Sequence, residues 1–364
     1  MPIYMDRHDV SESVTAEHVA QLHKEDLKIQ DTFGCRGLTY WFDDKRKTAF
    51  CLVEAPNEQA IRAMHDKAHG QIPHSIIEVD AGVVESFLGR IEDPKKNQEG
   101  ISESIDDPAF RTIMVIAKVP SFSGYSTFYQ IDESFTAYFE AIRHVIKAND
   151  GRVVRESKDL FIVSFESVSR AVAASLEINS ACQELHIDSF SSKIGLSAGV
   201  PVTEKKSIFE DTINLADRIC AMIPGDIIVS AEVAELALSE NINAFNNTQN
   251  FVILKSQEEN LITQLMDFID SSWSDSNLKV DDFSKPAGLS KSQLYRKLKT
   301  LTGKSPNTFL KDYRLKKALA LLNKNSGNVS EIAFETGFSS PSYFSKCFHK
   351  KYGHSPSEYL PANA

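Results

Sequence analysis

The last hundred residues contain an internal repeat that restricts what this part of the chain can fold into. The segments TGKSPNTFL (302–310) and YGHSPSEYL (352–360) share Gly, Ser, Pro and Leu at an offset of 50 residues. Further upstream the offset becomes 49, as between Gly288 and Gly337. A fixed period indicates that one supersecondary unit occurs twice. We therefore predict two copies of the same helical unit.

Each copy is predicted to contain two helices that cross at a sharp turn. A short helix ends at a glycine that can adopt positive φ, an apolar residue follows, and a serine caps the next helix. In the second copy the small Ala333 lies four residues before Gly337 and lets two helices cross closely, as a helix-turn-helix unit requires. The second helix of each unit presents polar and basic side chains that can enter the major groove of DNA. These residues are Ser292, Tyr295, Arg296 and Lys299 in the first unit and Pro341, Ser342, Tyr343, Lys346 and Lys350 in the second.

The charge distribution agrees with a DNA-binding segment. The chain has a net charge of −10, but residues 281–354 contain 14 Lys and Arg against 5 Asp and Glu. This segment therefore has a net charge of +9, which leaves −19 for the remainder. A basic block in an acidic protein is the electrostatic pattern expected of a nucleic-acid-binding module. A solvated basic helix face is the alternative interpretation of charge alone.

The two units also resemble a known family. The stretch EIAFETGFSSPSYFSKCFHKKYGHSPSEY (331–359) is similar to the signature of the AraC/XylS family of transcriptional regulators. The stretch DYRLKKALALL (312–322) is similar to the helix that joins the two units in that family. The resemblance covers about 100 residues and implies base-reading helices at 290–301 and 340–350. The partners expected are double-stranded DNA, RNA polymerase and a second copy of the chain.

The first unit departs from the family pattern at two positions. Pro286 lies inside the first short helix, where it removes a hydrogen bond or shortens the helix. Ser284 replaces the small alanine that is usual there, and in the second unit Leu360 stands where an arginine is common. We therefore expect the first unit to dock differently on DNA, or more weakly.

The rest of the chain is predicted to form two domains that mix strands and helices. Residues 1–91 have the order strand, helix, hairpin, helix, strand, which is the βαββαβ order of a ferredoxin-like α+β domain. Residues 92–110 are polar, charged and rich in proline at the ends, as in a linker. Residues 111–257 form a longer α/β domain, and residues 258–364 form the all-α domain with the double helix-turn-helix.

Histidines are concentrated at the N-terminus. Six of the ten lie within the first 74 residues, where chance placement gives about two. His65 and His69 are four residues apart on a predicted helix, so their imidazoles share a face and can chelate one metal ion. His8 and Asp6 point to one side of the first strand, and His23 comes near if both helices pack there. We predict that these four histidines hold a divalent transition metal, Ni²⁺ or Zn²⁺. Ordinary surface and helix-end histidines are the alternative.

The first domain resembles a small ferredoxin-like family that is described as nickel-binding. The residues that carry the resemblance are MPIYMDRH, TYWFD, AFCLVEAP and AHGQIPH. Cys51, in AFCLVEAP, is expected on the second strand of the hairpin. The resemblance implies metal or small-ligand sensing without identifying the ligand residues. Homo-oligomerisation through exposed sheets is a competing role for this domain.

The middle domain resembles the class III nucleotide cyclase catalytic domain, through KDLFIVSFESVSRAVAASLEI, KIGLSAGV and TINLADRICAMIPGDIIVS. That enzyme uses two carboxylates to hold two metal ions around a triphosphate. Asp159 matches the second carboxylate, but Lys118 stands at the first, so we expect no two-metal catalysis. The resemblance implies nucleotide contacts by Arg155, Asp159, Asn214 and Arg218. Local capping and pairing by Asn214 and Arg218 is the alternative.

Composition limits the remaining classes of function. No apolar run approaches the roughly 18 residues of a membrane-spanning helix, and no signal peptide is evident. Five scattered cysteines argue against a disulfide framework and for the cytoplasm. The Walker A and G-x-G-x-x-G motifs do not occur. We predict a non-enzymatic DNA-binding regulator that is modulated by a metal or small ligand and by dimerisation. An active cyclase with a DNA-binding tail, and a metal-storage protein, are the alternatives.

Overall fold

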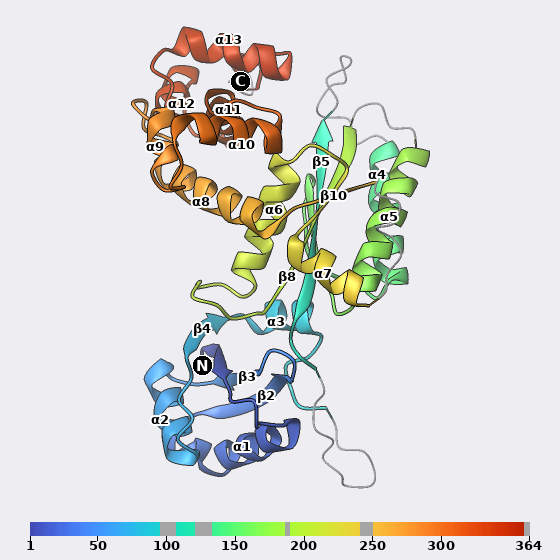
Figure 1. The fold of residues 1–364 in the computed structure, drawn as a ribbon, viewed down its shortest axis with the longest axis vertical. Coiled ribbons are helices and arrows are strands. Elements are labelled where there is room, and N and C mark those ends of the chain that lie inside the picture. The colour runs from blue at the N-terminus through green and yellow to red at the C-terminus, as the bar shows by residue number, and fades with distance from the viewer. Residues whose placement is uncertain (95–106, 121–132, 186–189, 241–249, 360–364) are drawn as a thin grey trace.

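The computed structural model describes residues 1–94, 107–120, 133–185, 190–240 and 250–359, and the statements below concern these residues. Three parts follow one another along the chain (Figure 1). A small sheet with two helices contains the N-terminus, a larger sheet follows, and a group of helices contains the C-terminal part. The predicted multidomain organisation, with an all-α C-terminal part, is thus observed.

The N-terminal part has the predicted βαββαβ order and forms a four-stranded antiparallel sheet with strand order β2-β3-β1-β4. Its elements are β1 (Ile3–Asp9), α1 (Ala16–Ile29), the short 3-10 helix η1 (Gln30–Phe33), β2 (Arg36–Asp43), β3 (Thr48–Glu54), α2 (Glu58–Ala68) and β4 (Ser75–Val79). Thr15 caps α1 and Asn57 caps α2 through side-chain oxygens that accept backbone N–H groups, which is why the helices begin there.

The two faces of this sheet have different partners. Because side chains alternate along a strand, Tyr4 and Cys51 face helices α1 and α2, whereas Met5 and Leu52 face the opposite way. Met5 and Leu52 belong to a buried core that also contains Ile113 and other residues of the middle sheet. This apolar face is therefore covered by the middle domain of the same chain, so it is not available for the competing role of homo-oligomerisation.

Helix α3 (Ala81–Leu88) was not predicted and lies between the two sheets. The guanidinium of Arg111, 2% exposed, donates to the carbonyl oxygens of Phe87 and Leu88 at the end of this helix and pairs with Asp107 at 3.1 Å. Of the predicted linker 92–110, residues 95–106 lie outside the described residues. Its last residues are not solvated as expected, since Ala109 and Phe110 are buried.

The middle part is a six-stranded mixed sheet with strand order β10-β9-β8-β5-β7-β6. Its elements are β5 (Arg111–Pro120), α4 (Glu133–Ala148), β6 (Arg152–Glu156), β7 (Leu160–Phe165), α5 (Val168–Glu184), β8 (Phe190–Gly199), α6 (Glu210–Met222), β9 (Ile227–Val229), α7 (Ala231–Ser239) and β10 (Phe251–Ile253). Helices α4, α5 and α7 cover one face with a large apolar core, and α6 packs on the other.

Helix α6 lies so close to strand β8 that only glycine fits at position 195. A Cβ atom there would lie 2.2 Å from the Ala216 carbonyl oxygen and 2.8 Å from Cys220 Cβ. We expect Gly195→Ala to lower the free energy of unfolding by about 1–3 kcal/mol, because the helix backbone would have to move. Urea unfolding followed by circular dichroism measures this. Gly82→Ala is the control, since its Cβ would meet only the Asp80 side chain; equal stability of the two variants would contradict the prediction.

The C-terminal part is helical and repeats as predicted. Its elements are α8 (Ser256–Ser272), α9 (Val280–Ser284), α10 (Lys291–Thr302), α11 (Pro306–Asn323), α12 (Val329–Glu335), α13 (Pro341–Tyr352) and the 3-10 helix η3 (Pro356–Tyr359). Gly303 and Gly353 end α10 and α13 in the left-handed conformation, with φ of 70° and 77°. Ser290 and Ser340 cap the starts of the same two helices. The 50-residue repeat is therefore also a repeat of helix ends.

The two units differ at Pro286, as the sequence indicates. Helix α12 continues to Glu335, whereas α9 ends at Ser284, two residues before the proline. Proline cannot donate a backbone hydrogen bond inside a helix, which accounts for the shorter helix. The Ser284 hydroxyl, buried where the second unit has Ala333, donates to the Asp281 carbonyl oxygen.

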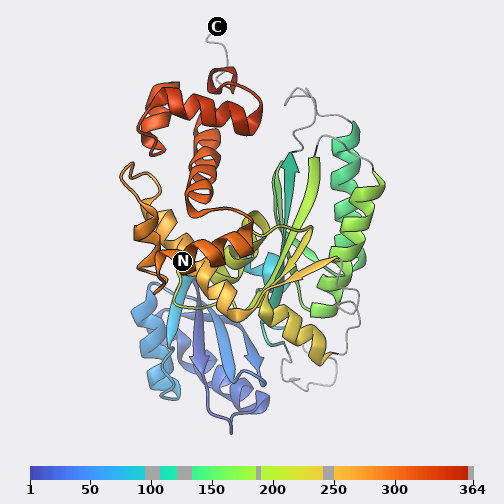
Figure 2. The same cartoon turned by 45° about the horizontal axis from the view of Figure 1, so that its top comes forward.

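The two units also differ in what they pack against (Figure 2). Leu294 and Phe309 of the first unit share a buried core with α8 and with Ile219 and Met222 of helix α6. The second unit has a separate core that includes Phe344 and is made only of residues from α11 onward. The first unit is therefore joined to the middle domain through α8. No helix in the described ranges is both long and apolar enough to cross a membrane.

Candidate DNA interface and metal centre

The first predicted recognition helix, α10, has one apolar face and one exposed face. Leu294 and Leu298 are buried in the first core, which fixes the rotation of the helix. All four residues assigned to DNA contact on this helix are exposed, namely Ser292, Tyr295, Arg296 and Lys299. The helix has no acidic residue, so no charge on it repels phosphates.

The second predicted recognition helix, α13, has the same organisation. Phe344 and Phe348 are fully buried, and their tilted rings are in contact with 5.6 Å between the ring centroids. Of the residues assigned to DNA contact, Ser342, Tyr343, Lys346 and Lys350 are exposed and Pro341, at the first helical position, is half-buried. This helix also contains no acidic residue. The structure thus leaves both predicted DNA-contacting faces accessible.

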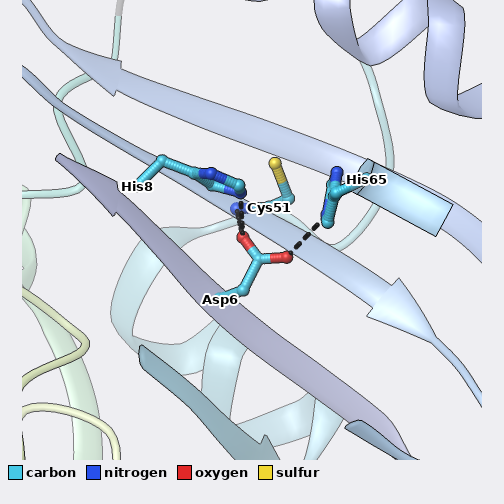
Figure 3. A group of neighbouring side chains, drawn as sticks. All are labelled: Asp6, His8, Cys51 and His65. Atoms are coloured by element: carbon cyan, nitrogen blue, oxygen red, sulfur yellow. Dashed lines mark hydrogen bonds and ion pairs between the residues drawn. The ribbon is translucent and has the colours of Figure 1, made fainter. Parts of the chain in front are cut away.

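A compact group of metal-ligating side chains lies between the N-terminal sheet and helix α2 (Figure 3). The ligand atoms of Asp6, His8, Cys51 and His65 lie within 4.8 Å of one another. Asp6 and His8 come from β1, Cys51 from the neighbouring β3, and His65 from α2. Asp6 lies opposite Cys51 in the β1–β3 register and accepts a hydrogen bond from the Cys51 backbone N–H at 3.1 Å.

His65 connects this group to a second one. Its Nε2 donates to Asp6 Oδ2 at 3.0 Å, and its Nδ1 donates to Asp26 Oδ1 at 3.1 Å. His69 Nε2 lies 3.2 Å from Asp26 Oδ1 and 3.3 Å from His65 Nδ1. Asp26, His65 and His69 therefore form a second potential metal-binding group. The two groups share one imidazole, with one ring nitrogen directed to each.

The electrostatics of the two groups favour negatively charged carboxylates on Asp6 and Asp26 and a positively charged imidazolium on His65. Burial disfavours the imidazolium, but Asp6 and Asp26 outweigh this effect and raise the pKa of His65 to about 10. Burial likewise opposes the two carboxylates, and the surrounding histidines nevertheless lower the pKa of Asp6 and of Asp26. Burial and the nearby Asp6 raise the pKa of the Cys51 thiol. A metal ion would therefore have to displace protons from His65 and Cys51.

The residues fit a divalent transition metal of borderline softness, such as zinc or nickel. Imidazole, thiolate and carboxylate in one group are the ligands that such ions prefer. His8 Nε2 is buried and forms an ion pair with Asp6 Oδ1 at 3.3 Å, so this imidazole is directed into the group.

Some of these residues are among those predicted from the sequence, and others are not. Three of the four predicted ligands, His8, His65 and His69, lie in the two groups. His23 lies outside both, because its Nε2 faces Asp93 at 3.3 Å. Asp26 was not predicted, although it follows His23 by three residues on α1 and so lies near the same helix face.

The four predicted nucleotide contacts are distributed over two elements and a turn. Arg155 lies on β6, and Asp159 precedes β7, where it pairs with Lys118 at 3.5 Å. Asn214 and Arg218 lie on α6. The guanidinium of Arg218 contacts helix α8, donating to Asp267 Oδ1 at 2.6 Å. The nucleotide assignment stays a prediction, and Arg218 has a different contact in this structure.

Both the C-terminal and the N-terminal part of the chain match known protein families. Residues 283–362 match the model of a helix-turn-helix domain, and residues 4–79 match the model described as nickel responsive protein SCO4226-like. The C-terminal domain is a helix-turn-helix domain of the AraC type. The N-terminal domain is SCO4226-like. Neither match includes the middle domain.

Individual relatives cover parts of the chain. This chain is 37% identical to the histidine kinase P4 of Formosa agariphila over 117 residues. The matched segment covers 32% of this chain and 8% of that protein. This chain is also 34% identical over 99 residues to the HTH-type transcriptional regulator MtrA of Neisseria gonorrhoeae. That match covers 27% of this chain and 31% of MtrA. The DNA-binding domain of AdpA, solved in complex with a target DNA, is 26% identical with a TM-score of 0.26, covering 27% of this chain and 86% of that one. The chain thus spans about a third or less of the length of these two curated relatives.

Proposed function

We propose that this protein is a sequence-specific DNA-binding transcriptional regulator whose affinity for DNA changes when a divalent transition metal binds its N-terminal domain. The observation that carries the proposal is the pair of capped helices α10 and α13, both exposed, basic and free of acidic residues. The similarity to MtrA, whose name describes it as an HTH-type transcriptional regulator, supports it. The assigned DNA-contacting residues are those on the exposed faces of these two helices.

The metal would be held by Asp6, His8, Cys51 and His65, with Asp26 and His69 as the adjoining group. The nickel-responsive description of the matching family supports nickel, and the ligand set also suits zinc. When bound, the ion supplies coordinate bonds that join β1, β3 and α2. Because Asp6 and Asp26 raise the pKa of His65, a bound metal ion would have to displace a proton from this imidazole.

We propose further roles for the remaining parts. The middle domain is a non-catalytic relative of the class III cyclase domain, supported by the sequence resemblance, and contributes to assembly as a homodimer. A nucleotide contact by Arg155, Asp159 and Asn214 belongs to the same proposal. RNA polymerase is the expected protein partner and the cytoplasm the expected compartment, both of which follow from the regulatory role.

The proposal is tested with the full-length chain. Duplexes are enriched from a random library, and the Kd for the selected duplex is measured by fluorescence anisotropy at several salt concentrations, with and without Ni²⁺ or Zn²⁺. We expect log Kd to rise linearly with log salt, since phosphate contacts release counterions. We expect metal to change Kd by about 5- to 150-fold. Failure to enrich any sequence would refute the regulator, and tight metal binding with an unchanged Kd would favour storage.

A further inference from the structure

Arg218 lies on helix α6, at the junction between the middle domain and the DNA-binding domain. Its guanidinium donates to Asp267 Oδ1 at 2.6 Å, to Asp270 Oδ2 at 3.2 Å and to the Thr263 carbonyl oxygen at 3.4 Å. These three partners are four and three residues apart on α8 and therefore lie along one face of that helix. The Arg218 side chain is 11% exposed. A planar, rigid guanidinium is suited to contact several acceptors at once.

Helix α8 is attached in turn to the helix that joins the two DNA-binding units. The Tyr313 hydroxyl on α11 donates to Asp270, the same carboxylate that accepts from Arg218. Arg314, the next residue, donates to the carbonyl oxygens of Trp273 at 2.8 Å and Asp275 at 2.6 Å. Hydrogen bonds therefore run without a break from α6 through α8 to α11.

Helix α6 also contacts the core shared with the metal-binding domain (Figures 1 and 2). Ala216 and Cys220 face the core shared with the N-terminal sheet, whereas Ile219 and Met222 face the core shared with α8. Just before the helix, the Phe209 ring lies 4.9 Å from the Phe87 ring of α3. Two cores therefore meet on adjoining faces of one helix.

The metal-binding strand reaches the same region. Arg7 lies between the candidate ligands Asp6 and His8, and its side chain points to the other side of β1. Its guanidinium donates to the Val202 carbonyl oxygen at 3.3 Å, in the segment that leads into α6. A shift of β1 on metal binding would therefore be transmitted through Arg7 to the segment that leads into α6. The tight contact of α6 with Gly195 prevents the helix from absorbing such a shift by bending toward the sheet.

We propose that Arg218 is a positioning residue that fixes the DNA-binding domain on α6, and that metal binding reaches DNA affinity through α6 and Arg218. The inference rests on the proposed metal response for its second half. It gives Arg218 a role in place of the nucleotide contact that the sequence resemblance implied. Without Arg218, Asp267 and Asp270 would face each other one turn apart on α8 without their shared cation, and like charges at this spacing repel.

The positioning role is tested first by hydrogen–deuterium exchange on the full-length, metal-free chain. We expect Arg218→Ala to speed the exchange of the amides of α8 and α10 by about tenfold or more, and Arg218→Lys to restore part of the protection by keeping the charge. Arg143→Ala is the control, because Arg143 forms an ion pair with Glu156 within the middle domain. If the amides of α8 exchange equally fast in Arg218→Ala and in the unaltered chain, the positioning role is wrong. This conclusion does not depend on the effect of metal binding.

The coupling role is tested by measuring the ratio of duplex Kd without and with Ni²⁺. In the unaltered chain we expect a ratio of about 5 to 150. In Arg218→Ala we expect a ratio near 1 with unchanged Ni²⁺ affinity of the DNA-free protein, and in Arg143→Ala the original ratio. A full ratio in Arg218→Ala would overturn the coupling role. A ratio of 1 in the unaltered chain would refute the metal response itself, and the exchange experiment would then decide the positioning role alone.

Discussion

Replacing Arg296 and Lys346 with alanine together is expected to weaken binding to the selected duplex by about 2–6 kcal/mol, which corresponds to roughly 30-fold to 10⁴-fold in Kd. Each residue lies on the exposed face of a different recognition helix, one on α10 and one on α13. A basic side chain that reaches a guanine edge contributes about 1–3 kcal/mol, and two separated contacts add nearly independently. Fluorescence anisotropy with the single and double variants measures both values.

Lys324→Ala is the matched control for this prediction. Lys324 is exposed and basic but lies at the end of α11, outside both recognition helices. We expect its replacement to change Kd little at physiological salt. If the double variant binds the selected duplex as tightly as the unaltered protein, the assigned recognition helices are wrong. If affinity for all duplexes falls equally, the two side chains contact phosphates and do not read bases.

The second large effect is expected at the metal centre. His65→Ala should lower the affinity for Ni²⁺ by more than about 100-fold, above the 10- to 100-fold that the loss of a residue supporting a ligand costs. The reason is geometric, because each of the two groups uses one ring nitrogen of His65. Isothermal titration calorimetry measures the affinity, and mass spectrometry of the intact protein measures the number of ions bound.

Controls separate the loss of a ligand from the loss of the fold. His65→Ala leaves Asp6 and Asp26 buried without their shared cation, so circular dichroism must first show that the variant is folded. His8→Ala removes a ligand from one group and His69→Ala removes a ligand from the other. Each of these two variants retains His65 between Asp6 and Asp26 and is therefore less affected by this problem. His23→Ala should bind Ni²⁺ normally, since His23 lies in neither group. Normal Ni²⁺ binding by folded His65→Ala and His8→Ala would refute the site.

Several features of this protein could be predicted from short stretches of sequence. The helix-turn-helix repeat followed from glycines that end helices, serines that begin them and apolar residues at helical spacing. The shortened first helix followed from Pro286, because the backbone of proline excludes the hydrogen bond that would continue α9. The βαββαβ order of the first domain followed in the same way from caps and periodicity. All these signals act between residues that are close in the sequence, so they can be recognised without knowing the tertiary structure.

Contacts between distant elements could not be predicted in this way. The histidine concentration indicated a metal centre, but only the packing of α1 on the sheet directs Asp26 to His65 and leaves His23 beside Asp93. Likewise, only tertiary structure turns Arg218 toward α8. A helix pattern determines which residues share a face, whereas the rotation of that helix against its neighbours depends on the whole apolar core. The sequence thus determined most of the elements and the kinds of ligand, and the tertiary structure decided which side chains meet.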